Sequence, residues 1–259
     1  MNMVQKNNRV LLGLSGGVDS TAAALLLKEK GYDVTGYFFD VTGNNKGREE
    51  AEEVAGQLGI EIICEDVSKD FRNVVIEDFC NEYLCGRTPN PCIICNPNIK
   101  FKKLIQTADK IGAYHIATGH YCRIKYDETA DKYFVRQGTS LKKDQSYMLY
   151  RLDQATLSRL IFPLGEAESK DDIRTLARDN NLSNAEKKDS QEICFIEEDY
   201  AGYIESMGFS SPEGDFTDKS GKVLGRHKGL LHYTIGQRKG IGIAPVSYTH
   251  LTLPTTRRV

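Results

Sequence analysis

The stretch Ser-Gly-Gly-Val-Asp-Ser at residues 15–20 constrains the fold of this chain more than any other. It follows an apolar run at residues 10–14 and precedes residues 21–28, which are rich in strong helix formers. The sequence therefore predicts a strand, a glycine turn and a helix in succession. Glycines in such a turn let the backbone come close to a ligand, and the unpaired N–H groups at the positive end of the helix favour an anion. We expect this turn to bind phosphate.

The turn differs from the two common phosphate-binding loops. It matches neither Gly-x-x-x-x-Gly-Lys-Ser/Thr nor Gly-x-Gly-x-x-Gly. Without a lysine in the loop, its nucleotide chemistry need not follow that of the P-loop kinases. The string resembles the PP-loop (Ser-Gly-Gly-x-Asp-Ser) of the ATP pyrophosphatases, which adenylate a substrate oxygen and release pyrophosphate. The alternative is a glycine-rich turn that binds nothing.

Strand and helix patterns alternate along the first two thirds of the chain. The strands are expected at residues 33–39, 60–64 and 114–118, and the helices at residues 48–58, within 71–84 and at about 170–179. Ser169 and Asp172 form a variant capping box for the last of these helices. This alternation predicts an α/β fold, a doubly wound parallel sheet with helices on both faces.

Ligands of such sheets bind at the carboxyl ends of the strands. The loop at Ser15, the strand end at Phe39 and the turn Gly119-His120 are therefore expected along one rim. Phe39 is a candidate for lining an adenine pocket, and an ordinary core position is the alternative.

Residues 88–101 carry the most unusual chemistry. Two X-Pro steps hold an extended segment, after which Asn96 is expected as the N-cap and Pro97 as the first residue of a helix. Cys95 would then precede a helix N-terminus with three lysines nearby, which favours the thiolate and makes Cys95 a candidate nucleophile. The alternative is a metal-binding pair of Cys92 and Cys95, which alone supplies half of a zinc site.

The remaining segments carry weaker signals. Residues 121–124 and 133–136 predict a hairpin, and residues 142–147 have the composition of a solvated loop. Cys194 lies in a short apolar run, where a buried, inert cysteine is the default. Residues 219–240 predict short twisted strands with a basic face that binds a phosphate backbone, with a solvated surface as the alternative. The basic residues are Lys219, Lys222, Arg226, Lys228, Arg238 and Lys239, and no Asp or Glu follows Lys219 in that window.

Composition narrows the class of protein. The 259 residues suit one large domain and part of another, and with a net charge of −2 any nucleic-acid binding has to come from local basic patches. The N-terminus lacks the apolar core of a signal peptide, and the longest apolar stretch, residues 21–27, is too short to span a bilayer. We expect a cytoplasmic protein with no membrane contact. Its seven cysteines are then free, catalytic or metal-bound rather than structural disulfides.

Seven separate strings resemble the bacterial tRNA-specific 2-thiouridylases of the MnmA type. They are Ser-Gly-Gly-Val-Asp-Ser at 15–20, Thr-Pro-Asn-Pro at 88–91, Cys-Asn-x-x-Ile-Lys-Phe at 95–101, Ala-Thr-Gly-His-Tyr at 117–121, Lys-Asp-Gln-Ser-Tyr at 143–147, Asp-Ser-Gln-Glu-Ile-Cys-Phe at 189–195 and Tyr-Thr-Ile-Gly-Gln-Arg-Lys-Gly at 233–240. The resemblance covers about residues 9–245. It implies ATP-dependent replacement of oxygen by sulfur at C2 of the wobble uridine of certain tRNAs, with ATP and Mg²⁺ as cofactors.

The resemblance also assigns residues to roles. Phe39 and Gly119 are implied as further contacts to the nucleotide, Cys95 as the nucleophile and Cys194 as the carrier of a persulfide. ATP is implied to bind at Gly13, Leu14, Ser15, Gly16, Gly17, Val18, Asp19 and Ser20. Positions that contact tRNA are implied at His120, Lys143, Asp144 and Gln145, and those that face the target base at Asn90, Pro91 and Cys92. The implied partners are tRNA and a sulfur donor, either a cysteine desulfurase or a sulfur relay protein, and we expect a monomer.

The chain departs from the family pattern in two places. Cys92 stands where many members have aspartate, so Cys92, Cys95 and Cys194 together supply three thiolates, enough to hold a [4Fe–4S] cluster in an alternative sulfur-transfer scheme. A different PP-loop ligase that needs neither cysteine is the other alternative. Relatives also continue into a β-barrel, which we expect to be largely missing here. We therefore predict a catalytic ATP-binding domain at 1–205, a small β domain at 206–245 and a tail of non-native appearance at 246–259.

Overall fold

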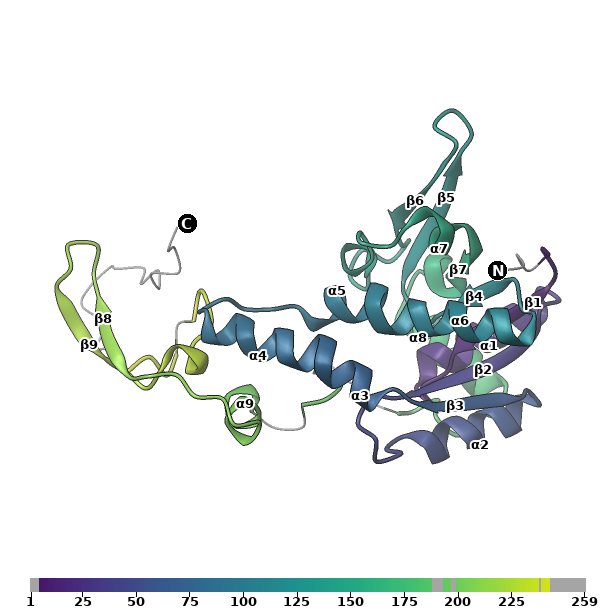
Figure 1. Cartoon of the computed structure of the whole chain (residues 1–259). Coiled ribbons are helices and arrows are strands. Elements are labelled where there is room, and N and C mark those ends of the chain that lie inside the picture. Colours follow the sequence, from purple (N-terminus) through teal and green to yellow (C-terminus); the bar gives the residue numbers. More distant parts are fainter. Residues whose placement is uncertain (1–4, 188–192, 197–198, 238, 243–259) are drawn as a thin grey trace. The chain divides into compact units, whose positions relative to one another are not determined.

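A computed structural model describes residues 5–187, 193–196, 199–237 and 239–242 (Figure 1). The tail at 246–259 and Arg238 lie outside these residues. The chain forms two compact units, the first made of Met1–Arg72 and Cys92–Gln191 and the second of Asn73–Pro91 and Glu192–Val259. The second unit therefore recruits a segment from the middle of the chain, which a division by sequence position does not anticipate.

The first unit is built on a five-stranded parallel sheet, as the alternating pattern predicted. Its strands, in the order β3-β2-β1-β4-β7, are β3 (Ile62–Asp66), β2 (Asp33–Asp40), β1 (Arg9–Gly13), β4 (His115–Ala117) and β7 (Leu160–Ile161). In the register of the central strand, Val10 pairs with Val34 on one side and His115 on the other. The strand predicted at 60–64 begins two residues later, because the N–H of Ile60 is still bonded to the carbonyl of Ala55 and closes the preceding helix.

Helices cover both faces of this sheet. The core on one face includes side chains of α1 (Val18–Glu29), α2 (Arg48–Leu58) and α8 (Lys170–Asp179), and the other core includes side chains of α6 (Phe101–Ile111) and α7 (Gln154–Arg159). The capping box of Ser169 and Asp172 forms as predicted. Strand order reverses between β2 and β4 on either side of β1, so the carboxyl ends of β1 and β4 mark the place where such sheets bind ligands.

A hairpin and several short elements complete the first unit. The hairpin of β5 (Cys122–Asp127) and β6 (Lys132–Gln137) projects from its body (Figure 1). It extends further toward its turn than predicted. Short helices also occur: α3 (Ser68–Phe71), η1 (Arg72–Ile76), which continues into the second unit, α5 (Pro91–Cys95), η2 (Asn96–Lys100), η3 (Ser146–Met148) and η4 (Pro163–Glu166).

The second unit is held together by aromatic side chains. It contains α4 (Glu77–Leu84), α9 (Tyr200–Ser206), the hairpin of β8 (Gly214–Thr217) and β9 (Val223–His227), and η5 (Leu230–His232). Phe79 of α4 packs edge-on against Phe195, with ring centroids 5.4 Å apart, and Tyr83 stacks on Tyr200 at 4.5 Å. These contacts explain why residues 73–91 join the chain that follows residue 192.

The basic segment at residues 219–240 contains one short strand in its described part, β9, where several were predicted, and one of its cations is paired. Arg226 Nε lies 3.3 Å from Glu213 Oε2. Glu213 precedes residues 219–240, the segment that itself contains no acidic residue. No helix in the described part of the chain is long and apolar enough to cross a membrane.

Candidate functional site

The loop between β1 and α1 is closed by its own hydroxyl groups. Ser20 Oγ donates to the carbonyl of Gly17 at 2.9 Å and accepts the N–H of Ser15 at 3.2 Å. Thr21 Oγ1 donates to the same Gly17 carbonyl at 3.0 Å. Leu14 and Val18 are buried and fasten the two ends of the loop to the core. The loop is therefore preorganised at the N-terminus of α1, where backbone N–H groups can receive an anion.

Two glycines allow other segments to lie directly against this loop. A Cβ on Gly16, whose φ is +72°, would lie 2.9 Å from the backbone nitrogen of Ala51. A Cβ on Gly119, after β4, would lie 3.0 Å from backbone atoms of Asp19 and Ser20. The structure thus brings together the loop and the Gly119 turn that the sequence placed on one rim. Only glycine, which has no Cβ, permits this close packing of one backbone segment on another.

Phe39 lies beside the start of the loop. A Cβ on Gly13 would come within 3.3 Å of the Phe39 ring, and this ring packs edge-on against Tyr37 with centroids 4.5 Å apart. The Phe39 side chain is partly buried against the core. Phe39 therefore packs against the core and also lies next to the loop. Its contact with adenine stays a prediction.

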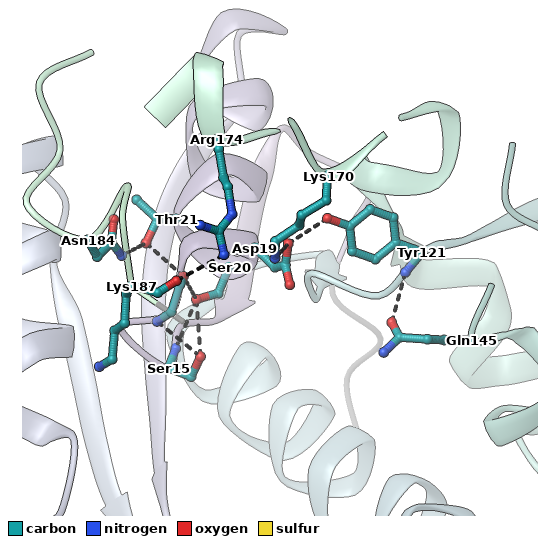
Figure 2. A network of polar contacts seen from close by, with 11 residues as sticks. Ser15, Asp19, Ser20, Thr21, Tyr121, Gln145, Lys170, Arg174, Asn184 and Lys187 are labelled. Carbon is teal, nitrogen blue, oxygen red and sulfur yellow. Dashed lines mark hydrogen bonds and ion pairs between the residues drawn. The ribbon is translucent and has the colours of Figure 1, made fainter. Parts of the chain in front are cut away.

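A lysine and a tyrosine converge on the loop aspartate (Figure 2). Lys170 Nζ, from the first residue of α8, and Tyr121 Oη each lie 2.5 Å from Asp19 Oδ1. The Lys170 side chain is 12% exposed and that of Asp19 36% exposed, so the ion pair is largely shielded from solvent. A cation is thereby held beside the loop that itself contains none.

An asparagine from a distant part of the chain also holds the loop. Asn184 Nδ2 donates to the carbonyl of Gly16 at 2.9 Å and to Thr21 Oγ1 at 2.7 Å, and the side chain is buried (Figure 2). Two more basic residues lie in this neighbourhood: Arg174 donates to the carbonyl of Lys187, whose amino group lies 3.7 Å from Glu50 Oε1. Basic side chains therefore lie on the side of the loop that faces α8, and two of them, Lys170 and Lys187, are paired with carboxylates.

The helix around Cys95 differs from the prediction. It begins at Pro91, not at Pro97, and Cys95 is the last residue of α5, with helical φ of −62° and ψ of −46°. Asn96 does not cap a helix, because it lies inside the helical run; its buried side chain donates to the carbonyl of Met148 at 3.1 Å. Pro97 lies inside the helical run, and its missing N–H is accommodated by the wider turn of η2.

Cys95 therefore has a different position from the one predicted. Cys95 does not precede a helix N-terminus, so the helix dipole no longer explains an activated thiolate. Cys92 and Cys95 are instead three residues apart on one helix, a spacing that places both side chains on the same face, and both are partly exposed. The neighbouring Asn90 is partly exposed and Pro91 buried.

The loop at 143–147 contacts the network around Asp19 through Tyr121. Gln145 Oε1 accepts the N–H of Tyr121 at 3.0 Å, while Tyr121 binds Asp19 (Figure 2). Asp144 accepts the N–H of Gly138 at 3.0 Å and the hydroxyl of Ser146 at 2.7 Å. Asp144 and Gln145 thus stabilise the local structure through hydrogen bonds. The side chain of Lys143 is partly exposed. Their contact with tRNA stays a prediction.

His120 is part of the core. It is 9% exposed, its Nδ1 lies 2.6 Å from Thr118 Oγ1, and it packs between Phe101 and Phe162. Burial, with a smaller contribution from Lys100, lowers the pKa of His120 well below its ordinary value, so the ring is neutral at pH 7. The side chain of His120 is buried in this structure. Its contact with tRNA stays a prediction.

Cys194 lies in the second unit and is exposed, whereas its neighbours Phe195 and Ile196 are buried. The default of a buried, inert cysteine is therefore wrong for Cys194. Within the described residues, no three His, Cys, Asp or Glu side chains are grouped so as to hold a metal ion. The meeting of Cys95 and Cys194 stays a prediction.

Gly16 offers a direct test of the close packing at the loop. Gly16→Ala combines the strain of a positive φ, about 1–2 kcal/mol, with a backbone clash of about 1–3 kcal/mol. Gly31→Ala is the matched control, because Gly31 has φ of +80° but nothing within 4 Å of a Cβ. We expect Gly16→Ala to lower Tm more than Gly31→Ala and to weaken ATP binding, measured by thermal denaturation and calorimetry. Equal effects of the two substitutions would contradict the packing described here.

Three site residues were not recognised in the sequence as parts of the site. Lys170, Tyr121 and Asn184 reach the loop from 102 to 168 positions away. Lys170 appears in the sequence only as the first residue of a capped helix, and Tyr121 only as the end of the string Ala-Thr-Gly-His-Tyr. No spacing rule connects them to Asp19.

Comparison with known proteins shows two matching family models and close relatives. The model described as tRNA methyl transferase HUP domain matches residues 8–198, and the one described as tRNA methyl transferase PRC-barrel domain matches residues 202–250. "tRNA-specific 2-thiouridylase MnmA 2" of Thermoanaerobacter sp. (strain X514) is 47% identical over 254 residues, which are 92% of this chain and 70% of the relative. "tRNA-specific 2-thiouridylase MnmA" of Syntrophomonas wolfei is 47% identical (91% of this chain, 69% of the relative), and that of Clostridium acetobutylicum is 45% identical (92% and 70%).

Proposed function

This chain belongs to the family of tRNA-specific 2-thiouridylases, and from that premise we propose that it replaces the C2 oxygen of the wobble uridine of tRNA by sulfur, with consumption of ATP. The observation that carries the proposal is the preorganised loop at residues 15–20. Gly16 and Gly119 let neighbouring backbone pack directly against this loop, and Lys170 places a cation beside it. The C2 oxygen of uracil is a poor leaving group. A site that binds ATP beside the base allows this oxygen to be adenylated, which makes it a good leaving group.

The first step is adenylation of the base. The C2 oxygen of uridine attacks the α-phosphorus of ATP, and pyrophosphate leaves. The loop N–H groups stabilise the charge on the departing pyrophosphate, and we propose that Lys170, held on Asp19, contributes to the same end. Mg²⁺ bound with the nucleotide supplies additional charge neutralisation. The wobble base has to leave the anticodon stack to reach this loop.

The second step transfers sulfur. The terminal sulfur of a persulfide on Cys194 attacks C2, and AMP leaves, which joins Cys194 Sγ through one sulfur atom to the base. The Cys95 thiolate then attacks Cys194 Sγ, so that the S–S bond breaks and the electron pair stays on the sulfur of the base. The products are 2-thiouridine and a Cys95–Cys194 disulfide, which an external thiol reduces. The persulfide itself comes from a cysteine desulfurase or a sulfur relay protein. In a variant of this step, the Cys95 thiolate attacks Cys194 Sγ of the persulfide first, so that the Cys95–Cys194 disulfide forms and hydrosulfide leaves. The hydrosulfide then attacks C2, and AMP leaves.

A second scheme is supported by the position of Cys92. Because Cys92 and Cys95 lie on one face of a helix, they can supply two thiolates to a [4Fe–4S] cluster whose third ligand is Cys194. Iron and labile-sulfide analysis of anaerobically purified protein distinguishes the schemes: the persulfide scheme requires neither element, and the cluster scheme requires about four of each per chain.

The proposed activity is tested by anaerobic incubation with ATP, Mg²⁺, a cysteine desulfurase with cysteine, and an unmodified tRNA transcript. We expect 2-thiouridine at the wobble position, detected by mass spectrometry of the digested tRNA, in an amount that depends on ATP. Absence of the product with a donor shown to be active would contradict the proposal.

A further inference from the structure

The β5–β6 hairpin has two chemically different faces. Directly paired residues of an antiparallel hairpin share a face, and here Ile124 pairs with Val135 and Tyr126 with Tyr133. Ile124, Tyr133 and Val135 pack against the core of the first unit. The opposite face, which we call the hairpin face, is formed by the pairs Arg123 with Arg136, Lys125 with Phe134 and Asp127 with Lys132.

The hairpin face is cationic around an exposed aromatic ring. Lys125, Lys132 and Arg136 are exposed, and Phe134 is 45% exposed directly opposite Lys125. The one acidic residue, Asp127, accepts the N–H groups of the turn residues 129 and 130.

The two arginines show that this arrangement is not optimised for stability. Arg123 and Arg136 lie directly opposite each other, and like charges in this position destabilise a hairpin. Arg123 is held by Glu166, 3.4 Å away, and by the carbonyl of Gln137 at 2.8 Å. In the described part of the chain, no carboxylate lies within 4.0 Å of the charged groups of Lys125, Lys132 or Arg136. The hairpin face therefore presents cations without a carboxylate partner next to an exposed phenyl ring. A partner that is both negatively charged and planar could bind to both.

We propose that the hairpin face binds RNA, with its cations on phosphates and one unpaired base stacked on Phe134. Single-stranded RNA is recognised by this combination of basic groups and aromatic rings. An acidic protein would neutralise the cations but would give no reason for a ring opposite Lys125. The inference rests on the proposed function in one respect: it takes the RNA to be the substrate tRNA. The projection of the hairpin from the body of its unit lets it contact a tRNA at a distance from the reacting base (Figure 1).

The test separates stacking from charge. Dissociation constants for an unmodified tRNA transcript are measured across a series of KCl concentrations for the full chain and for single variants. Phe134→Ala is expected to weaken binding about 5- to 150-fold without changing the salt dependence, and Phe134→Trp to restore it. Lys125→Ala and Arg136→Ala are each expected to reduce the slope of log K against log salt by about 1. Lys30→Ala, exposed at the carboxyl end of α1 and away from the loop, is the matched control and should change neither quantity.

The outcomes distinguish this inference from the proposed function. If the chain thiolates tRNA but the hairpin variants bind like the wild type, the inference is wrong and the function stands. If the variants lose affinity as expected but no 2-thiouridine forms, the inference stands and the function is wrong. Unchanged tRNA affinity with impaired sulfur delivery would assign the hairpin face to a protein donor and overturn the inference, and a chain that binds no tRNA would overturn both.

Discussion

Cys95→Ser is expected to stop 2-thiouridine formation after sulfur has reached the base. The Cys194 persulfide still attacks C2 and AMP still leaves, but no thiolate is present to break the remaining S–S bond. A covalent adduct of protein and tRNA should therefore accumulate, visible as a band that dithiothreitol removes. In a single turnover without added thiol, the rate of 2-thiouridine formation should fall at least about 10³-fold, the scale seen when a covalent nucleophile is removed.

Cys194→Ser should fail one step earlier. It cannot carry the persulfide, so neither adduct nor product forms, while tRNA-dependent release of AMP by slow hydrolysis of the adenylate persists. Cys85→Ser is the matched control, because Cys85 is also an exposed cysteine of the second unit, and it should retain full activity. Full activity of Cys95→Ser without added thiol would contradict the mechanism and favour a PP-loop ligase of another kind. An adduct in Cys194→Ser would contradict the assignment of the persulfide.

Lys170→Met is expected to lower the rate of tRNA-dependent adenylation about 100-fold, within the range found when one preorganised electrostatic contact is removed from a reaction site. Lys170 Nζ lies 2.5 Å from Asp19 Oδ1 and is largely shielded from solvent. Without it, the Asp19 carboxylate faces the phosphates of ATP with one cation fewer. The rate is measured as pyrophosphate release in a single turnover, and ATP affinity by calorimetry.

Lys187→Met is the matched control for this substitution. Lys187 lies in the same neighbourhood, but its side chain is 46% exposed, and its amino group lies 3.7 Å from the half-exposed Glu50. Because such an exposed pair is weak, the loss of Lys187 should change the rate less than about 5-fold. A double variant with Asp19→Asn tests the coupling: it should be no slower than Asp19→Asn alone if Lys170 acts through Asp19. Equal, small effects of Lys170→Met and Lys187→Met would show that the pair is structural.

Much of the fold follows from local sequence patterns. The strand, turn and helix around residues 9–29, the helix at 48–58 and the capped helix at 170–179 lie where the sequence predicted them. Their signals are short-range: apolar periodicity, glycine at a positive φ and a capping box act within a few residues. The helix at Cys95 was misplaced because the prediction started it at Asn96 and Pro97, whereas the helical backbone already begins at Pro91 and continues through them. The side chain of Asn96 is used instead to bind the carbonyl of Met148, 52 positions away.

The sequence by itself determined the family, the parallel α/β architecture and the glycine-rich turn between β1 and α1, because each is encoded in contiguous strings. Only the tertiary structure decided that Lys170, Tyr121 and Asn184 converge on the loop, that His120 is buried and that Cys194 is exposed. The physical reason is the same in each case. Burial and pairing are set by residues that are distant in sequence and meet only when the sheet and its helices pack, so a local pattern carries no information about them.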